Sequence, residues 1–151
     1  MKKFLISGLL LAISAAPAAA EAIFAVDVFT IDNLTYDLER ARLSKLVSAP
    51  IVVQRIDLIS QFETEMSANL PPNEDKALKV ATERLAKHSN AEIQSLYSQG
   101  LNSIQLAREI GVKKVPAVVF NRKWIVYGLD PLRAYQIFEE RNETGALEAK
   151  N

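Results

Sequence analysis

The sequence contains no cysteine and a single histidine among its 151 residues. Without cysteine the chain forms no disulfide, offers no thiol nucleophile and holds neither an iron–sulfur cluster nor a cysteine-ligated zinc ion. One histidine gives no Cys/His dyad and little material for a histidine metal site. These absences exclude thiol chemistry, and we expect neither a metal nor a cofactor.

An excess of charge of one sign is also lacking, since 18 Lys and Arg side chains balance 18 Asp and Glu side chains. Such a balance gives no electrostatic reason to bind nucleic acid or an anionic membrane. Beyond the N-terminal leader, no stretch approaches the roughly 20 apolar residues that span a bilayer. We therefore expect no nucleic-acid partner and no stable membrane insertion of the processed chain.

The first 20 residues have the pattern of a cleaved secretory signal peptide. Lys2 and Lys3 precede a short apolar run, and Ala18 to Ala20 forms a small-residue cleavage site. We expect cleavage between Ala20 and Glu21, which would deliver the processed chain to the periplasm. An N-terminal membrane anchor or a buried helix is the alternative interpretation.

The remaining sequence predicts one α/β domain at residues 21–147, followed by a flexible tail at 148–151. Short β-branched and aromatic runs predict strands, and longer amphipathic runs between them predict helices. A strand, a helix and a second strand at the start predict two parallel strands joined by a right-handed crossover. The predicted strands lie at 22–30, 51–59, 115–120 and 124–127, the last two as a hairpin, with a helical stretch at about 60–111.

Capping residues mark the predicted helix ends. Asn73 is a candidate N-cap, and Asp130 caps the last helix with proline at its first position. Gly111 is a good C-terminal cap residue. We expect Gly100 and Asn102 to bend or interrupt the helix that begins near residue 90.

The stretch "GVKKVPAVVFNRKWIVYG", Gly111 to Gly128, resembles the second half of the thioredoxin-like fold. The order of elements is similar throughout the domain, and the helical stretch resembles the insertion of periplasmic disulfide oxidoreductases. The resemblance implies a mixed sheet with an enlarged helical insertion and helices on both faces. It also implies a cis peptide bond between Val115 and Pro116, beside the start of the first helix.

One departure from that fold family decides the expected chemistry. The family places its dithiol after the first strand, but this chain has "FTIDNLTYDL" there, with Leu34 and Asp37 near the thiol positions. A narrower resemblance is to exported thioredoxin-like proteins of integrating conjugative elements, similar to pilus-assembly proteins of type IV secretion. It is carried by "VFT" at Val28–Thr30 and by the late strand pair, and it implies conjugation or secretion-system proteins as partners.

These observations predict a redox-inactive, non-catalytic component of a conjugative transfer system. An extended segment of a partner is expected to pair with the outward-facing backbone beside Pro116. The expected partner-binding residues are Val115, Pro116, Leu34 and Thr35. A cysteine-independent thioredoxin-like enzyme and a purely structural oligomeric subunit remain the alternatives.

Three other features favour structural roles. Asp27 interrupts an apolar strand, and we expect its carboxylate to face outward or to bond to the backbone. His88 lies on an apolar helical stripe and is expected to be partly buried or to cap a helix end. Trp124 and Tyr127 are expected to pack in the core.

Overall fold

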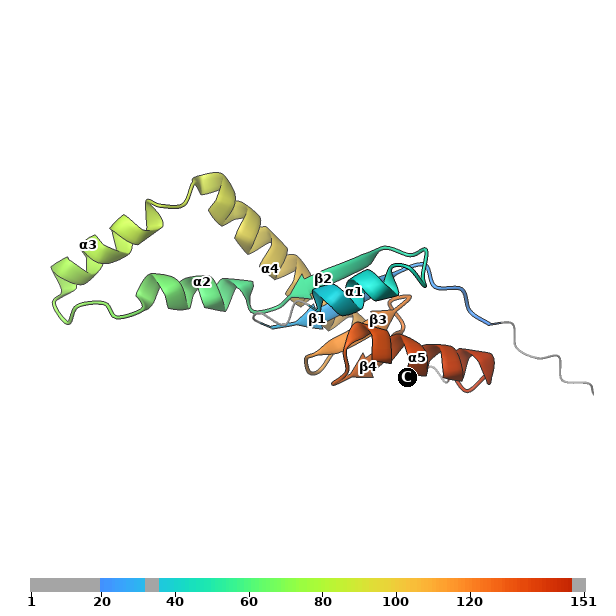
Figure 1. The fold of residues 1–151 in the computed structure, drawn as a ribbon. Coiled ribbons are helices and arrows are strands. Elements are labelled where there is room, and N and C mark those ends of the chain that lie inside the picture. The colour runs from blue at the N-terminus through green and yellow to red at the C-terminus, as the bar shows by residue number, and fades with distance from the viewer. Residues whose placement is uncertain (1–19, 32–35, 148–151) are drawn as a thin grey trace, which may run out of the picture.

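The computed structural model describes residues 20–31 and 36–147, which form a mixed α/β fold of four strands and five helices (Figure 1). The predicted signal peptide, except for Ala20, and the predicted tail at 148–151 lie outside the described residues. The strands are β1 (Val26–Thr30), β2 (Ile51–Arg55), β3 (Ala117–Phe120) and β4 (Trp124–Tyr127). The helices are α1 (Asp37–Leu43), α2 (Leu58–Ser67), α3 (Glu74–Leu85), α4 (Asn90–Ile110) and α5 (Pro131–Glu143).

The four strands form one sheet in the order β2-β1-β3-β4. β1 and β2 are parallel, and β3 is antiparallel to both β1 and β4. The predicted parallel pair and the predicted hairpin are therefore confirmed. Both outer strands are sheet edges, and β1 lies at the centre, flanked by β2 and β3.

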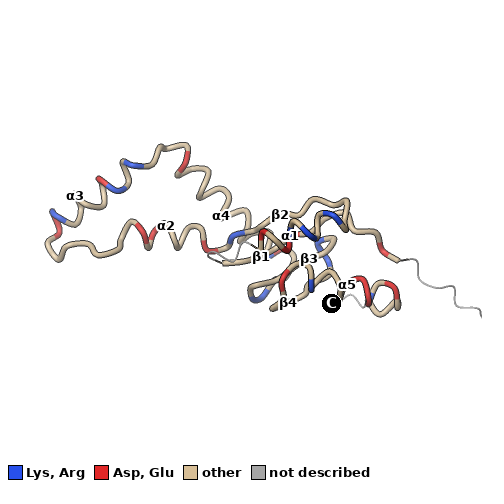
Figure 2. Tube along the Cα trace, in the orientation of Figure 1, with Lys and Arg blue, Asp and Glu red and all other residues tan. Residues whose placement is uncertain are grey.

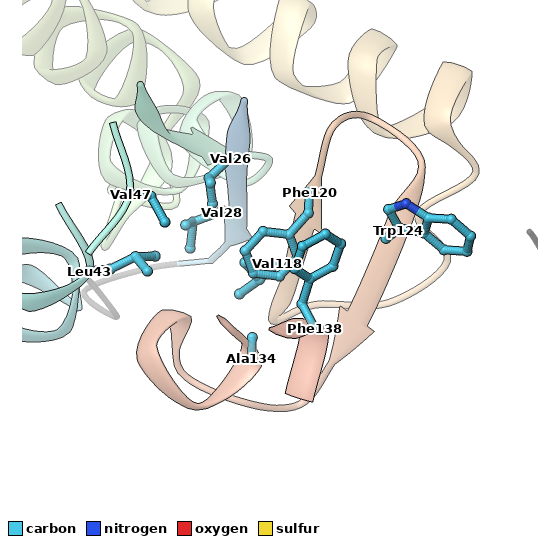
Figure 3. Packing of buried hydrophobic residues seen from close by; sticks show 9 residues of the cluster. All are labelled: Val26, Val28, Leu43, Val47, Val118, Phe120, Trp124, Ala134 and Phe138. Carbon is cyan, nitrogen blue, oxygen red and sulfur yellow. The ribbon is translucent and has the colours of Figure 1, made fainter. Parts of the chain in front are cut away.

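The sheet is covered on both faces, as predicted. On one face, Leu43 and Val47 lie opposite Ala134 and Phe138 of α5, around the side chains of β1 and β3 (Figure 3). The Phe120 and Phe138 rings stack there with their centroids 4.6 Å apart. On the other face, the C-terminal part of α4 packs against Phe29 and its neighbours in β3. Successive side chains of β1 point to opposite faces of the sheet, and all five residues of β1 are buried. Both faces of the central strand are therefore covered.

The helices α2, α3 and α4 leave the sheet together, and α3 lies at the far end (Figure 1). We call residues 58–99 the helical arm. Its small core is Phe62, whose ring meets the His88 and Tyr97 rings edge-on at 5.4 and 6.2 Å. Arg84 also donates hydrogen bonds to three carbonyls at the C-terminal end of α2. Charges of both signs alternate along α3 (Figure 2).

The three predicted caps are confirmed, but the predicted interruption of the long helix is wrong. Asn73 accepts from the Lys76 N–H, Asp130 accepts from the Arg133 N–H, and Gly111 ends α4 with φ of 85°. Residues 90–110 form one continuous helix through Gly100. Gly100 serves close packing instead, because a Cβ there would lie 2.8 Å from Ile59 Cγ1.

The second strand is also shorter than predicted. The sequence predicts a strand to residue 59, but β2 ends at Arg55 and α2 begins at Leu58. Leu58 and Ile59 turn into the helix because they pack against Gly100 of α4 rather than continuing the sheet. Short apolar runs of this kind do not distinguish strand from helix by their pattern alone.

Candidate functional site

The predicted loop lies beside the end of the central strand. The Val115–Pro116 peptide bond is cis, as predicted. Phe29 pairs with Ala117, so the register places Pro116 opposite Thr30, the last residue of β1. On the other side of Thr30, the Ile56 N–H donates to the Thr30 carbonyl at 3.2 Å. The loops that follow β2 and precede β3 therefore flank the end of β1.

Four apolar residues gather at this end of the sheet. We call Ile31, Ile56, Val115 and Pro116 the β1-end surface. Ile56 and Val115 pack against the buried Phe29 cluster, whereas the Ile31 residue is 43 % exposed. The N–H and C=O of Val115 have no hydrogen-bond partner among the described residues. The surface thus combines an exposed aliphatic side chain with two backbone groups that can pair with another chain.

The start of α1 lies at the same end of the sheet. Burial raises the pKa of Tyr36, the N-cap residue of α1, and the nearby Asp130 carboxylate raises it further. Asp130 follows Gly128, whose N–H donates to the Pro116 carbonyl at 2.9 Å. The electrostatic effect of Asp130 on Tyr36 and the Gly128–Pro116 hydrogen bond thus put Tyr36 on the same side of the molecule as Pro116. The predicted site residues Leu34 and Thr35 lie outside the described residues.

The charged residues around the β1-end surface are mostly occupied by other contacts. Arg55 forms an ion pair with Asp57 at 2.9 Å and also donates to Gln61. The Lys114 ammonium lies over the Tyr127 ring, 5.3 Å from its centroid. These contacts hold the polar rim in place around an apolar centre. The arrangement suits an extended, largely apolar segment better than a strongly charged one.

The prediction that the Asp27 carboxylate faces outward or bonds to a backbone group is wrong, because the carboxylate is buried and bonds to a side chain. Asp27 is 4 % exposed, and its Oδ1 accepts a hydrogen bond from Gln54 Nε2 at 2.9 Å. Ser103 of α4 in turn donates to Gln54 Oε1 at 3.0 Å. The neighbouring strand satisfies the buried carboxylate, which the sequence of β1 alone does not reveal. Gln54 and Ser103 also line a shallow cleft of about 280 Å³ between β2 and α4.

This network has the geometry of a structural contact rather than of a catalytic site. The Ser103 hydroxyl donates to an amide oxygen, so no base activates it as a nucleophile. His88 packs against Phe62 in the helical arm, which agrees with its predicted partial burial. The described residues contain no group of three His, Asp or Glu side chains that could hold a metal ion. Within the described helices, none has the length and apolar character needed to cross a bilayer.

Residues 34–143 match DUF1525, a family described as a protein of unknown function. The chain belongs to the DUF1525 family. The match covers α1 through α5 and includes the Val115–Pro116 loop of this DUF1525 chain, whereas β1 precedes it. No curated protein matches the chain. The comparison therefore assigns a family without assigning a reaction.

Sequence reasoning found the loop but missed two of the four residues in the β1-end surface of this DUF1525 chain. Val115 and Pro116 were predicted from their motif, whereas Ile31 and Ile56 were not. Ile31 follows the end of the first strand, and Ile56 follows the observed end of β2. Because each is one more apolar residue after an apolar strand, its residue type does not mark it as part of a binding surface. Only the pairing of β1 with both neighbours brings these two residues beside Pro116.

Proposed function

We propose that the chain is a non-catalytic, periplasmic, thioredoxin-like component of a conjugative transfer system. In this proposal the β1-end surface binds an extended segment of another protein of that system. The observation that carries the proposal is that the N–H and C=O of Val115 have no hydrogen-bond partner among the described residues, at the same end of the sheet as the exposed Ile31. Backbone groups of this kind pair with an incoming strand, and a neighbouring apolar side chain adds affinity.

The rest of the proposal is supported by resemblance and composition. The parallel β1–β2 pair, the β3–β4 hairpin and the position of the Val115–Pro116 loop before β3 support the thioredoxin-like part of the proposal. The absence of cysteine from the sequence removes the nucleophile of thioredoxin chemistry. The leader and the late strand pair favour export and conjugation. Without that nucleophile, the role left in this proposal is binding of a partner at the β1-end surface.

The expected contribution of Ile31 can be estimated from its exposure. Covering the exposed 43 % of this residue would contribute about 1 kcal/mol, or about fivefold in affinity. An aspartate at this position would also have to lose its hydration on binding. We therefore expect Ile31→Asp to weaken partner binding by at least about tenfold.

The test uses a photo-crosslinking amino acid at position 31, in cells that carry the conjugative element. We expect a specific crosslink to one conjugation protein, and we expect Ile31→Asp to lower the transfer frequency. The matched control is Leu78, which is 67 % exposed on α3 and lies away from the surface. A normal transfer frequency with Ile31→Asp, or equal crosslinking from both positions, would contradict the proposal.

Two further measurements separate the alternatives. Turnover by the purified chain in a disulfide-reduction assay would support a cysteine-independent enzyme. A stable oligomer in light scattering that is unaffected by Ile31→Asp, together with normal transfer by that variant, would support a purely structural subunit. Under the present proposal the purified chain shows no turnover.

A further inference from the structure

Residue 21, the first residue after the expected cleavage site, is held by an unusually complete set of contacts. Its backbone N–H donates to Asn142 Oδ1 at 2.8 Å, and its carbonyl accepts from Asn142 Nδ2 at 2.9 Å. A single side-chain amide therefore satisfies both backbone groups of Glu21. Asn142 lies 121 positions away in the sequence and is 9 % exposed, so this contact is part of the folded core.

The Glu21 side chain has its own partners. The Trp124 indole N–H donates to Oε2 at 3.0 Å, and Asn121 Nδ2 donates to Oε1 at 3.2 Å. The Lys123 ammonium lies 3.6 Å from Oε2 and 4.4 Å from the centroid of the Trp124 ring. Both carboxylate oxygens are thus bound by donors that point to them from the β3–β4 turn and the start of β4.

Asn121 also fixes the residues that follow Glu21. Its Oδ1 accepts from the Phe24 N–H at 2.8 Å, and its Nδ2 donates to the Ala22 carbonyl at 2.9 Å. The residue has φ of 55° and is only 6 % exposed. The turn between β3 and β4 is therefore shaped around the chain segment that leads from residue 21 into β1.

We propose that Asn121, Lys123, Trp124 and Asn142 form a receptor for the first residue of the processed chain. Hydrolysis of the Ala20–Glu21 bond consumes one water and leaves a carboxylate on Ala20 and an ammonium on Glu21. The nitrogen of that bond is the one that donates to Asn142. After cleavage the ammonium donates to Asn142 Oδ1, and a charged donor strengthens this hydrogen bond.

Docking in this way gives the processed chain a fixed N-terminus. Residue 20 is exposed in the structure, whereas residue 21 is half-buried. An aminopeptidase, which removes residues one at a time from a free N-terminus, would remove Ala20 but would have to extract Glu21 from its contacts. The receptor is thus expected to define residue 21 as the stable first residue.

The experiment compares chains that begin at Ala20, Glu21 and Ala22. Incubation with an aminopeptidase should remove Ala20 from the first chain and stop at Glu21 in both longer chains, as read by intact mass. Trp124 is the single tryptophan of the sequence, so its fluorescence reports directly on the receptor. The chain that begins at Ala22 should emit at longer wavelength and melt at least about 5 °C lower.

Matched substitutions test the receptor itself. Asn142→Ala should allow trimming past Glu21, whereas Gln136→Ala on the exposed side of α5 should not. Glu21→Gln should shift the tryptophan emission, whereas Glu83→Gln on α3 should leave it unchanged. Should Asn142→Ala fail to fold, the three chain lengths still decide, because they carry no substitution and differ only at the N-terminus.

Several outcomes would overturn the proposal. One is trimming that passes Glu21 in the unsubstituted chain as fast as in Asn142→Ala. Another is identical emission and melting of the chains that begin at Glu21 and Ala22. An exported chain whose mass begins downstream of Glu21 would also overturn it, whatever the outcome at the β1-end surface.

Discussion

The helical arm should open locally when its one buried side chain is truncated. Phe62 is 7 % exposed, and it is the only buried residue between 58 and 99, a stretch that the structure describes throughout. Replacing a buried phenylalanine with alanine costs about 3–5 kcal/mol. Phe62→Ala also removes the ring contacts to His88 and Tyr97, which join α2 to the start of α4.

The loss in the free energy of unfolding should be confined to the helical arm and should leave the sheet unaffected. α2 and α3 have 10 and 12 residues, and isolated helices shorter than about 12–15 residues are only marginally stable in water. The C-terminal part of α4 packs independently against the Phe29 cluster through Leu106 and Ile110. We therefore expect a boundary near Ser103, with opening on the N-terminal side of that residue.

Amide hydrogen exchange measured by mass spectrometry tests this expectation. In Phe62→Ala, peptides from residues 58–97 should lose protection, while peptides from β1 and β3 should keep theirs. The matched control is Phe138→Ala, the same truncation in the main core, which should lower protection throughout the chain. Equal loss of protection in the arm and the sheet of Phe62→Ala would refute the reasoning.

Three further outcomes follow from single contacts. Gly100→Ala should destabilise the arm by about 1 kcal/mol in urea melts, because displacing Ile59 outweighs the gain in helix propensity. Gln54→Ala should lower the free energy of unfolding by about 2–4 kcal/mol, because it removes the hydrogen-bond donor to the buried Asp27 carboxylate. Adding Asp27→Val to Gln54→Ala should restore part of that loss. Hydrogen bonding to the indole lowers the pKa of Glu21, so its contribution to the melting temperature should be present above about pH 4.5 and fall below it; Glu21→Gln should flatten that dependence.

Local signals in the sequence were sufficient for much of the fold. Asn73, Gly111 and Asp130 act through neighbours within a few residues, so their residue types mark helix ends directly. The strand pair around residues 121–123 was predicted for a similar reason, since two apolar runs flank a short polar turn. The backbone conformation of this turn was not predicted. Asn121 and Arg122 both have φ of 55°, a conformation for which glycine is the usual residue.

The errors share a different cause, which is contact between distant segments. Gly100 looked like a helix break because glycine has low helix propensity, but its missing side chain makes room for Ile59. Asp27 looked unsuited to burial because its partner Gln54 lies on another strand. In both cases tertiary packing reversed the preference of the isolated residue. The contacts of Glu21 were missed for the same reason, since their partners lie about a hundred positions away.

The two proposed binding regions lie at opposite ends of the central strand. Glu21 precedes β1, whereas Ile31 follows it, and the five residues of β1 alone separate them by about 13 Å. Sites more than about 7–10 Å apart that share no partner usually contribute additively. Glu21→Gln should therefore lower the melting temperature without changing partner binding. Ile31→Asp should weaken partner binding without changing the melting temperature. The double variant should therefore have the stability of Glu21→Gln and the binding free energy of Ile31→Asp, each to within about 0.5 kcal/mol. A larger coupling, measured by a double-mutant cycle on binding and melting, would mean that β1 transmits the state of the N-terminus to the β1-end surface.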